Sequence, residues 1–380
     1  MAPATPFLLT PGPLTTTDET KRAMLRDWGS RDTDFIALNK WVRDRLVALA
    51  GGQGTHVAVP LQGSGTFVVE AMLGTFVPHA AKLLILVNGA YGRRMVQMCK
   101  YYGRAHVIYE TAEDVPPDPA EVDARLEKDA AISHVSVVHC ETTSGILNPV
   151  ADIAAVVANR GRRLLIDAMS AFGALPMDAH EVQFDALAAS SNKCIEGVPG
   201  MGFVIAREAA LVECEGNAAS LSLDLHDQWR AMERNGQWRF TPPTHVIAAF
   251  ARALEQHEAE GGVAGRGARY RRNCNVLIDG LRALGFETLL PDRLQAPIIV
   301  TVLMPADPRF VFERFYDRLR EKGYVIYPGK LTVANTFRIG CIGAIGESEM
   351  RGALAAIQAT LGEFGVAHCG PAIPVRAAGE

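Results

Sequence analysis

The sequence lacks the features that mark several classes of protein. Its seven cysteines are scattered, and none belongs to a CxxC pair, which argues against a disulfide framework and favours a reducing compartment. No uncharged apolar run reaches the roughly 20 residues that a membrane helix requires. The first residues have neither the basic nor the apolar region of a secretory signal. We therefore expect a soluble, cytoplasmic protein.

The charge pattern removes further classes. The formal net charge is −4, so there is no general basic field, and we expect neither nucleic acid nor a membrane as a partner. The ten histidines show no HxxxH spacing, which makes a metal site unexpected. The glycine fingerprint GxGxxG is missing, which disfavours a nicotinamide dehydrogenase. Any anionic ligand must therefore be held by local groups.

What is present is an alternating α/β pattern. With 380 residues and 48% hydrophobic content, the chain is long enough for two domains. Short apolar runs alternate with longer helical patterns, which predicts an α/β fold with a mostly parallel sheet. The predicted strands are 55–59, 83–87, 105–109, 134–139, 163–167, 185–189 and 201–206, and the predicted crossover helices are 65–76, 91–102, 119–129 and 152–159.

The pattern changes after residue 208. Two long helices are predicted at 244–260 and 267–284, followed by strands at 298–303, 324–327 and 335–339 and helices at 308–322 and 347–362. This second part reads as a small α+β domain. We expect an N-terminal segment at 1–20, a large cofactor-binding domain at 21–260, a small C-terminal domain at 261–365 and a disordered tail at 366–380.

Lys193 is the most informative residue of the chain. It follows a predicted strand, and Asp167 ends another strand 26 positions upstream. A pyridoxal phosphate enzyme needs one lysine to hold the cofactor and one carboxylate to keep the pyridine nitrogen protonated. Most lysines are simply solvated, and an acid after a strand is often a cap or turn residue. Lys193, however, lies among Ser, Asn, Gly and Pro rather than on an amphipathic helix, which favours the functional interpretation.

Other polar residues also follow predicted strands, and open α/β sheets bind ligands beyond the carboxyl ends of their strands. The segment QGSGTF at 62–67 opens a helix, so its amides and the Ser64 and Thr66 hydroxyls could hold a phosphate. Tyr91 begins the next helix and could stack on a ring. Thr142 and Thr143 could bond a ring oxygen. An ordinary turn or a packed aromatic is the alternative at each position.

Several longer motifs resemble one enzyme family. They are LLTPGPL (8–14), WGSRDTDF (28–35), QGSGT (62–66), CETTSGILNP (140–149), SNKCIEGVPG (191–200), WRFTPPTH (238–245), VIYPGK (325–330) and FRIG (337–340). Together they resemble the class V aminotransferase branch of the fold-type I pyridoxal phosphate enzymes, over the range from Leu8 to about Leu361. The resemblance implies a large domain with a mostly parallel sheet and a small α+β C-terminal domain.

The resemblance also implies roles for individual residues. Lys193 would carry pyridoxal 5′-phosphate and Asp167 would pair with its pyridine nitrogen. Arg338 would bind the substrate acid group, a task that suits a planar guanidinium. We expect Arg31 as a second cation for a phosphonate, with a salt bridge to Asp32 or Asp34 as the alternative. The remaining implied cofactor contacts are Ser64, Gly65 and Thr66 at the phosphate, Tyr91 on the ring, Thr142 or Thr143 at the phenolic oxygen, Asn192, and Thr241 from the neighbouring subunit of a homodimer.

Two positions depart from related small-amino-acid transaminases. Those enzymes usually carry Trp where this chain has Tyr91, and some have Gln where it has Asn192. Both replacements keep stacking or hydrogen-bonding capacity, so they bear on the substrate class more than on cofactor use.

The resemblance implies a reaction in which 2-aminoethylphosphonate gives its amino group to pyruvate, yielding phosphonoacetaldehyde and L-alanine. A transaminase of the same fold that acts on alanine, serine and glyoxylate is the nearest alternative. A pyridoxal-dependent lyase or cysteine desulfurase would use a thiol such as Cys194 or Cys341 as a nucleophile. A catalytically silent protein of this fold is disfavoured because every expected catalytic position is filled.

Overall fold

The structure is a computed structural model that describes residues 5–329 and 334–372. The chain divides into two compact units. The larger unit comprises Thr16–Glu141 and Asn148–Arg266, and the smaller comprises Met1–Thr15, Thr142–Leu147 and Gly267–Glu380. The boundary between Arg266 and Gly267 falls inside helix α10 (Gly262–Ala283). Part of the predicted tail, 373–380, lies outside the described residues.

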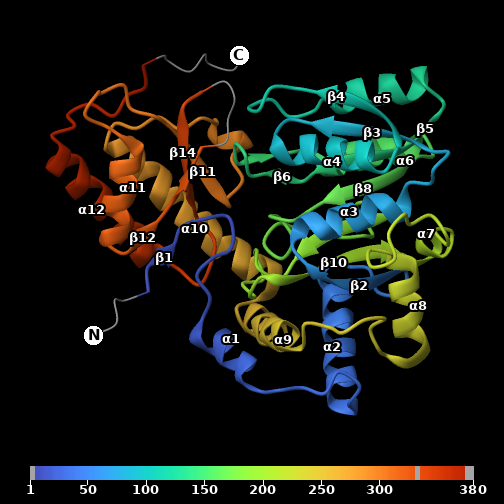
Figure 1. Cartoon of the computed structure of the whole chain (residues 1–380). Helices are drawn as coiled ribbons and strands as arrows, with labels where there is room; N and C mark the ends of the chain where they lie inside the picture. Colours follow the sequence, from blue (N-terminus) through green and yellow to red (C-terminus); the bar gives the residue numbers. More distant parts are fainter. Residues whose placement is uncertain (1–4, 330–333, 373–380) are drawn as a thin grey trace. The chain divides into compact units, whose positions relative to one another are not determined.

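A seven-stranded sheet forms the centre of the larger unit, in the order β2-β10-β9-β8-β5-β3-β4 (Figure 1). Strand β10 runs antiparallel to both of its neighbours, whereas the β9–β8, β8–β5, β5–β3 and β3–β4 pairs are parallel. The mostly parallel sheet expected from the sequence is thus confirmed. The strands are β2 (His56–Gly63), β3 (Lys82–Val87), β4 (Ala105–Glu110), β5 (Ile132–Val138), β8 (Arg163–Asp167), β9 (Ala186–Ser190) and β10 (Gly200–Arg207).

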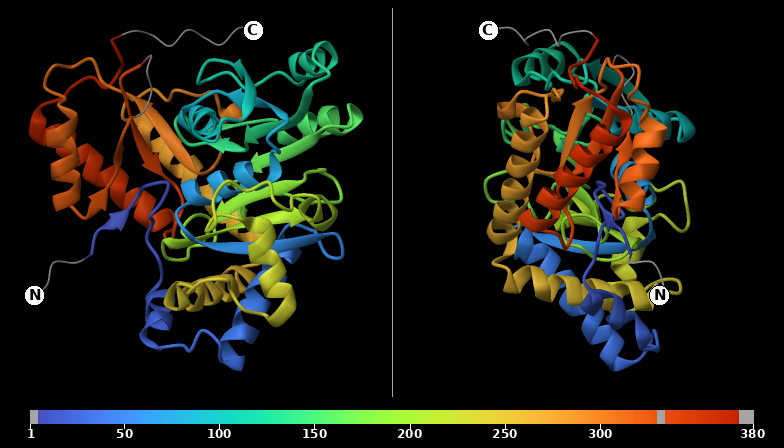
Figure 2. Two further views of the ribbon diagram at one scale, coloured as in Figure 1. Left: turned by 45° about the vertical axis from the view of Figure 1, so that its right-hand side comes forward. Right: turned by 90° about the vertical axis from the view of Figure 1, so that its left-hand side faces the viewer.

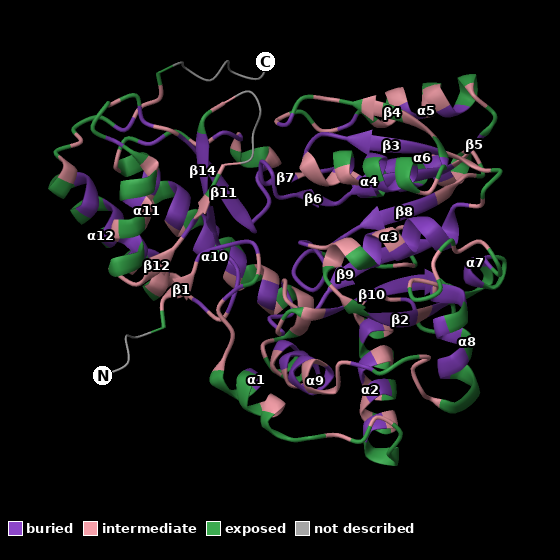
Figure 3. Cartoon of the chain, in the orientation of Figure 1, coloured by how far each residue is buried: buried purple, intermediate pink, exposed green. Residues whose placement is uncertain are grey.

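The central strands are apolar on both faces because helices cover both (Figure 3). On one face, α3 (Gly65–Phe76) and α4 (Ala90–Tyr101) pack on a core that includes Val138 and Leu165. On the other, the Phe203 ring lies 5.8 Å from the ring of Phe250 on α9 (Thr244–Ala259). Further helices of this unit are α1 (Asp18–Arg22), α5 (Pro119–Lys128), α6 (Val150–Asn159), α7 (Glu208–Val212) and α8 (Leu225–Asn235).

Helix α2 (Thr33–Leu49) is missing from the elements predicted by the sequence. Its buried face carries Phe35, Asn39, Val42 and Leu46, which are spaced as a helix requires. The polar Asn39 interrupts the apolar stripe, and its side-chain oxygen accepts a hydrogen bond from Trp238 Nε1 at 3.0 Å. The helical signal was therefore present but weakened by one buried polar residue whose partner is distant in sequence.

The smaller unit is an α+β structure. Its three-stranded antiparallel sheet has the order β11-β14-β13, with β11 (Ile299–Leu303), β14 (Thr336–Gly340) and β13 (Tyr327–Pro328). Strands β1 (Phe7–Leu8) and β12 (Tyr324–Val325) form a parallel pair. Helices α11 (Phe312–Glu321, orange) and α12 (Glu347–Phe364, red) pack together (Figure 2). The Phe337 ring at their centre has the rings of Phe286, Phe310, Phe312 and Phe315 around it.

No helix within residues 5–329 and 334–372 is both long enough and apolar enough to cross a membrane.

Candidate active site

Asp167 and Lys193 lie at the carboxyl ends of neighbouring strands. Asp167 is the last residue of β8, and Lys193 comes three residues after β9 ends at Ser190. The two strands pair in parallel, with Asp167 opposite Ala188. The charge of Lys193 acts on the Asp167 carboxyl and opposes the rise in its pKa. The fold therefore brings the acid and the lysine into electrostatic reach, although 26 positions separate them in the sequence.

The Asp167 carboxyl is almost fully buried, and this dominates its titration. The pKa of Asp167 is raised to about 6, chiefly by burial and to a lesser extent by the nearby Glu141 carboxyl. The Met169 N–H donates to Asp167 Oδ1 at 3.0 Å, and with Lys193 and Arg94 it opposes the rise. A buried acid of this kind is suited to a cationic ligand group, which would compensate the lost hydration.

A closed turn fixes the backbone on either side of Lys193. The Ser191 hydroxyl donates to the Val198 carbonyl at 2.6 Å, and the Gly197 N–H donates to the Ser191 carbonyl at 2.8 Å. The Glu196 N–H donates to the carbonyl of Lys193 itself at 2.8 Å. A Cβ at Gly197 would lie 2.8 Å from the Ser191 carbonyl oxygen, so this turn requires glycine.

A buried arginine ties the same turn to the start of α10. Arg266 donates through Nη1 to the Cys194 carbonyl, and the same nitrogen lies 3.4 Å from Glu196. Its Nε donates to Glu260 at 2.6 Å. With charged neighbours on both sides, the buried guanidinium is compensated and holds the residues that follow Lys193 in place.

The residues around the start of α3 form a cradle suited to a phosphate. Gly63 has φ of 119°, a conformation that favours glycine. Ser64 is the N-cap, and its hydroxyl makes no capping bond to the helix. A Cβ at Gly65 would lie 2.5 Å from Met169 Sδ, so a side chain there would require the Met169 side chain to move. The first N–H groups of α3 have no partner within the helix, and such a helix start attracts anions.

Arg94 adds a positive charge to this cradle. Its Nη1 donates to Thr66 Oγ1 at 3.1 Å, and its guanidinium carbon lies 4.9 Å from the centre of the Tyr91 ring. Arg94 also lowers the pKa of Asp167. This residue was not anticipated from the sequence, although its position near the start of α4, the helix that follows β3, was a usable signal.

Glu141 is a second buried acid that the sequence reasoning missed. Its Oε2 accepts a hydrogen bond from the Tyr91 N–H at 3.1 Å, which anchors the first turn of α4. A Cβ at Gly89 would lie 2.4 Å from Glu141 Cδ, so the glycine before α4 makes room for this carboxyl. The Tyr91 side chain is partly buried against the core beside Met169. The arrangement places an aromatic ring on the same side of the sheet as Asp167.

The remaining candidates in the larger unit are less enclosed. Asn192 Oδ1 accepts a hydrogen bond from the Ser190 hydroxyl at 3.0 Å. Thr241 is exposed in the segment between α8 and α9, and Arg31 is exposed in the turn before α2. Asp34 lies 3.5 Å from Arg26 Nη2, so one of the two acids considered as partners of Arg31 has another cation beside it.

Thr142, Thr143 and Arg338 belong to the smaller unit. Arg338 is buried in β14 and donates through Nη1 to the Thr142 carbonyl at 2.8 Å. Its Nε donates to the Pro328 carbonyl at 3.1 Å. Two carbonyls thus orient the guanidinium, and one of them is the backbone carbonyl of Thr142, the residue before Thr143.

The donor set of the larger unit fits pyridoxal phosphate. Lys193 provides an amine, Asp167 a buried acid for the pyridine nitrogen, and the start of α3 with Arg94 an anion cradle. The thiols, by contrast, are poorly suited to nucleophilic chemistry. Cys194 is fully buried, and burial raises its pKa to about 12. The pKa of Cys341 is raised well above its usual value, first by its hydrogen bond with Cys274 and then by burial.

The sequence matches the model of one protein family, class V aminotransferases, over residues 63–309. It is 55% identical over 361 residues to a 2-aminoethylphosphonate–pyruvate transaminase of Pseudomonas putida, covering 95% of this chain and 98% of that one. It is also 55% identical over 362 residues to the corresponding transaminase of Rhizobium meliloti, with 95% and 94% covered.

Solved structures of aminotransferases have the same fold as this chain. Pyridoxamine–pyruvate aminotransferase from Mesorhizobium loti superposes with a TM-score of 0.88 at 25% identity, covering 97% of this chain and 95% of that one. Alanine–glyoxylate aminotransferase from Nostoc superposes with a TM-score of 0.88 at 22% identity, covering 95% and 96%.

The raised pKa of Asp167 predicts that this residue makes the cofactor-free protein less stable as the pH rises. Because its pKa is raised from 3.8 to about 6 on folding, the folded state keeps a proton that the unfolded state loses. The stability from this group is present below pH 4 and is lost as the pH rises through 6. At pH 8, Asp167→Asn should therefore raise the free energy of unfolding by up to about 3 kcal/mol.

Urea unfolding of the cofactor-free protein between pH 4 and pH 8 measures this effect. The gain from Asp167→Asn should shrink toward zero near pH 4. Asp152→Asn, at an exposed acid of α6, is the matched control. A gain from Asp167→Asn that does not depend on pH would show that the carboxyl charge is not its cause.

Proposed function

Because the chain belongs to the class V aminotransferase family, we propose that it transfers the amino group of 2-aminoethylphosphonate to pyruvate, giving phosphonoacetaldehyde and L-alanine. The observation that carries this proposal is the near full-length likeness to transaminases named for those substrates. The buried acid and lysine at the strand ends of the larger unit supply the chemistry that such a transfer requires.

Pyridoxal 5′-phosphate is the cofactor that we assign to this site. When bound, it supplies an electron sink that stabilises negative charge on the substrate carbon next to the amine. Lys193 would hold it covalently, and Asp167 would face its pyridine nitrogen. Ser64, Gly65 and Thr66 would bind its phosphate. Tyr91 and Asn192 from the larger unit and Thr142 or Thr143 from the smaller would complete its contacts.

Lys193 is also the base that we assign to the reaction. Its Nζ, once neutral, would move the proton from the substrate carbon that bears the nitrogen to the cofactor carbon, and in the opposite half-reaction it would move a proton back to the carbon that receives the nitrogen. Lysine suits this task when nearby positive charge and partial desolvation favour its neutral form. The closed turn from Ser191 to Val198 holds the backbone, so that the motion of the side chain alone carries the proton.

Asp167 acts on the reaction through its charge. The carboxylate would keep the pyridine nitrogen protonated, and this is the electrostatic contribution that the electron sink depends on. In return, the cation would lower the pKa of Asp167 from its raised value. The protonated ring would therefore compensate the unfavourable burial of the acid, and this compensation would contribute to binding of the ring.

The substrate acid groups require cations of their own. We assign this role to Arg338, whose planar guanidinium matches carboxylate and phosphonate oxygens. Two carbonyls already orient it, which reduces the entropy lost on binding. The exposed Arg31 is our candidate for the second negative charge of a phosphonate.

We further propose a cytoplasmic homodimer with shared sites. Two large apolar side chains of the larger unit are exposed next to candidate cofactor contacts: Phe67, 51% exposed, follows Thr66, and Phe240, 45% exposed, precedes Thr241. Burial of such side chains by a second subunit would be favourable. The seven buried free thiols are consistent with a reducing compartment.

Lys193 should carry the cofactor. Borohydride treatment of the holoenzyme followed by peptide mass analysis should find the pyridoxyl group on this residue. In parallel, 2-aminoethylphosphonate added alone should convert the visible cofactor band to that of the amine form faster than L-serine does. A label on another lysine would overturn the assignment, and a preference for serine would favour the alanine/serine–glyoxylate alternative.

Thr241 should act in the site of the neighbouring subunit. Heterodimers that combine a Thr241→Ala chain with an Asp167→Ala chain contain one intact site if the site is shared. Their activity should rise well above that of either parent once subunit exchange has been verified by mass. Mixtures that stay at the level of the parents would place Thr241 in its own subunit's site or outside the reaction.

Arg338 should matter for both substrates and Arg31 for the phosphonate alone. A charge-assisted hydrogen bond is worth about 1.5–3 kcal/mol, so Arg338→Gln should lower kcat/KM by roughly tenfold or more for 2-aminoethylphosphonate and for L-alanine. Arg31→Ala should lower it mainly for the phosphonate.

The matched control for Arg31 is Arg26→Ala, which removes a nearby exposed arginine that lies beside Asp34. Melting temperatures of all variants separate binding from folding. Equal losses for the two substrates in Arg31→Ala would eliminate this residue as a phosphonate selector.

A further inference from the structure

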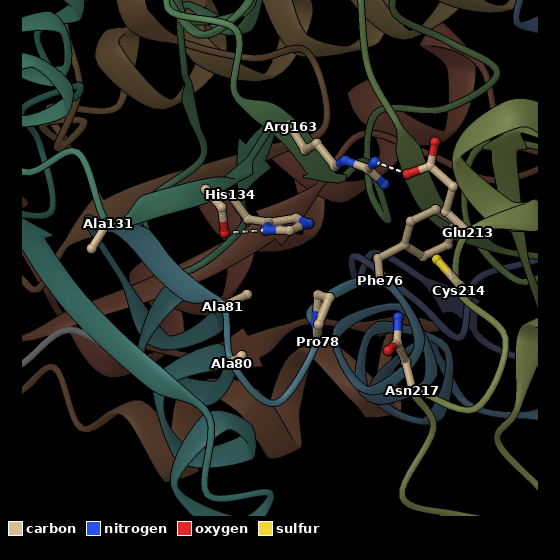
Figure 4. Close-up of a pocket in the computed structure, with 11 residues that line it drawn as sticks. Phe76, Pro78, Ala80, Ala81, Ala131, His134, Arg163, Glu213, Cys214 and Asn217 are labelled. Carbon is tan, nitrogen blue, oxygen red and sulfur yellow. Dashed lines mark hydrogen bonds and ion pairs between the residues drawn. The ribbon is translucent and has the colours of Figure 1, made fainter.

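A pocket lies at the amino ends of the strands of the central sheet, whereas Asp167 lies at the carboxyl end of β8. Its volume is about 350 Å³. It is formed by the start of β5, the start of β8, the end of α3 and the segment after α7 (Figure 4). All of these elements belong to the larger unit. The lining residues that matter here are Phe76, Pro78, Ala81, His134, Arg163 and Asn217.

The pocket is separate from the candidate active site. His134 and Arg163 are paired in register on neighbouring parallel strands, so their side chains share one face of the sheet. Asp167 is on the same face of β8 but four residues further along, at about 13 Å. Helix α3 runs between the two places, with Gly65 beside Met169 at one end and Phe76 in the pocket at the other. Nothing in the transamination chemistry uses the residues of this pocket.

His134 presents an unsatisfied polar atom to the pocket. The residue is only 4% exposed, and its Nδ1 lies 2.8 Å from the Ser133 hydroxyl. Its Nε2 is buried without a hydrogen-bond partner among the described residues. The Phe76 backbone interacts with the ring weakly as a hydrogen-bond partner and slightly raises the pKa of His134, but no group of the described residues satisfies Nε2 with full hydrogen-bond geometry. Figure 4 shows the ring directed between Arg163 and Phe76.

The imidazole is neutral under ordinary conditions. The pKa of His134 is lowered to about 4, first by burial and then by the positive charge of Arg163, against the smaller opposing effects of Asp185 and the Phe76 backbone. When the Ser133 hydroxyl donates to Nδ1, the ring proton is on Nε2. The imidazole then offers one N–H donor to the pocket, next to a guanidinium.

Arg163 has an internal partner that is easily displaced. Its Nη2 is bonded to Glu213, whose side chain is 63% exposed. An exposed glutamate loses little by turning into solvent. A ligand carboxylate would replace the Glu213 carboxylate on the Arg163 guanidinium. It would also accept a hydrogen bond from His134 Nε2–H, which Glu213 does not do. The pocket walls at Phe76, Pro78 and Ala81 are apolar.

We propose that this pocket binds a small aliphatic monocarboxylate. One oxygen accepts from His134 Nε2 and the carboxylate pairs with Arg163, while the short apolar chain lies against Phe76, Pro78 and Ala81. A single negative charge is favoured over a phosphate dianion because Arg163 is the one guanidinium among the described lining residues and the histidine is neutral. The volume of the pocket limits the ligand to a few carbon atoms.

The test is calorimetric titration of the holoenzyme with propionate. Arg163→Gln should weaken binding at least tenfold, because it removes the charged donor. Glu213→Gln should strengthen it severalfold, because it removes the competing carboxylate. These opposite effects distinguish ligand binding from a structural role, since both variants lose the same salt bridge and should have similar melting temperatures. Propionamide, which is neutral and of equal size, should bind at least tenfold more weakly.

Because the proposed substrates carry acid groups, the assay must distinguish propionate in this pocket from propionate at the candidate active site. In ¹³C-labelled histidine spectra, the His134 signal, assigned with His134→Gln, should shift along the same saturation curve as the heat. Absence of saturable binding would mean that only water satisfies Nε2 and would overturn the proposal. Tighter binding of inorganic phosphate than of propionate would overturn the monocarboxylate assignment. If Arg163→Gln fails to fold, weaker or unchanged binding in Glu213→Gln is by itself sufficient to refute it.

Discussion

The burial of the Asp167 carboxyl beside Lys193 is the constraint on which the functional part of this protein depends. A carboxylate removed from water loses its hydration, and here burial raises its pKa to about 6. The surrounding structure recovers part of that loss through the Met169 N–H and the charges of Lys193 and Arg94. The Met169 N–H is local to the turn after β8 and Arg94 acts from α4, but Lys193 comes near the acid because β8 and β9 are adjacent, parallel and in their observed register. The sheet order therefore determines the charges around Asp167 as well as the packing of the core.

Hydrogen bonds and close packing hold the backbone around this acid in a fixed position. Lys193 lies in a turn closed by Ser191 and held by the buried Arg266. The start of α3 approaches the Met169 side chain so closely that a side chain at Gly65 would displace it. Such sites are costly for stability, because a buried acid and a helix start without capping bonds both favour a ligand over the empty state. The same features make the larger unit suited to hold an anionic cofactor with a protonated ring, and the smaller unit independently orients a guanidinium in β14.

The α3 face of the sheet carries polar chemistry at both of its ends. At the carboxyl ends of the strands, Asp167 is surrounded by charged neighbours that compensate it. At the amino ends, His134 and Arg163 share the face with an apolar wall, and a histidine nitrogen is left without a protein partner. Between them the face is filled by core residues such as Leu165. We assign the first end to the proposed transamination, and the second has chemistry suited to a different, smaller ligand.

The sequence by itself determined the α/β class, the positions of most strands and the helix at 65–76, because apolar periodicity and glycine-rich turns are local signals. It also singled out Lys193 and Asp167, since both follow apolar runs and parallel strands end at one edge of a sheet. Helix α2, Glu141, Arg94 and Arg266 were missed. Their burial and partners arise only when strands and helices distant in sequence are packed together, as does the pairing of His134 with Arg163. Register, desolvation and charge compensation are properties of the tertiary structure, and no local pattern encodes them.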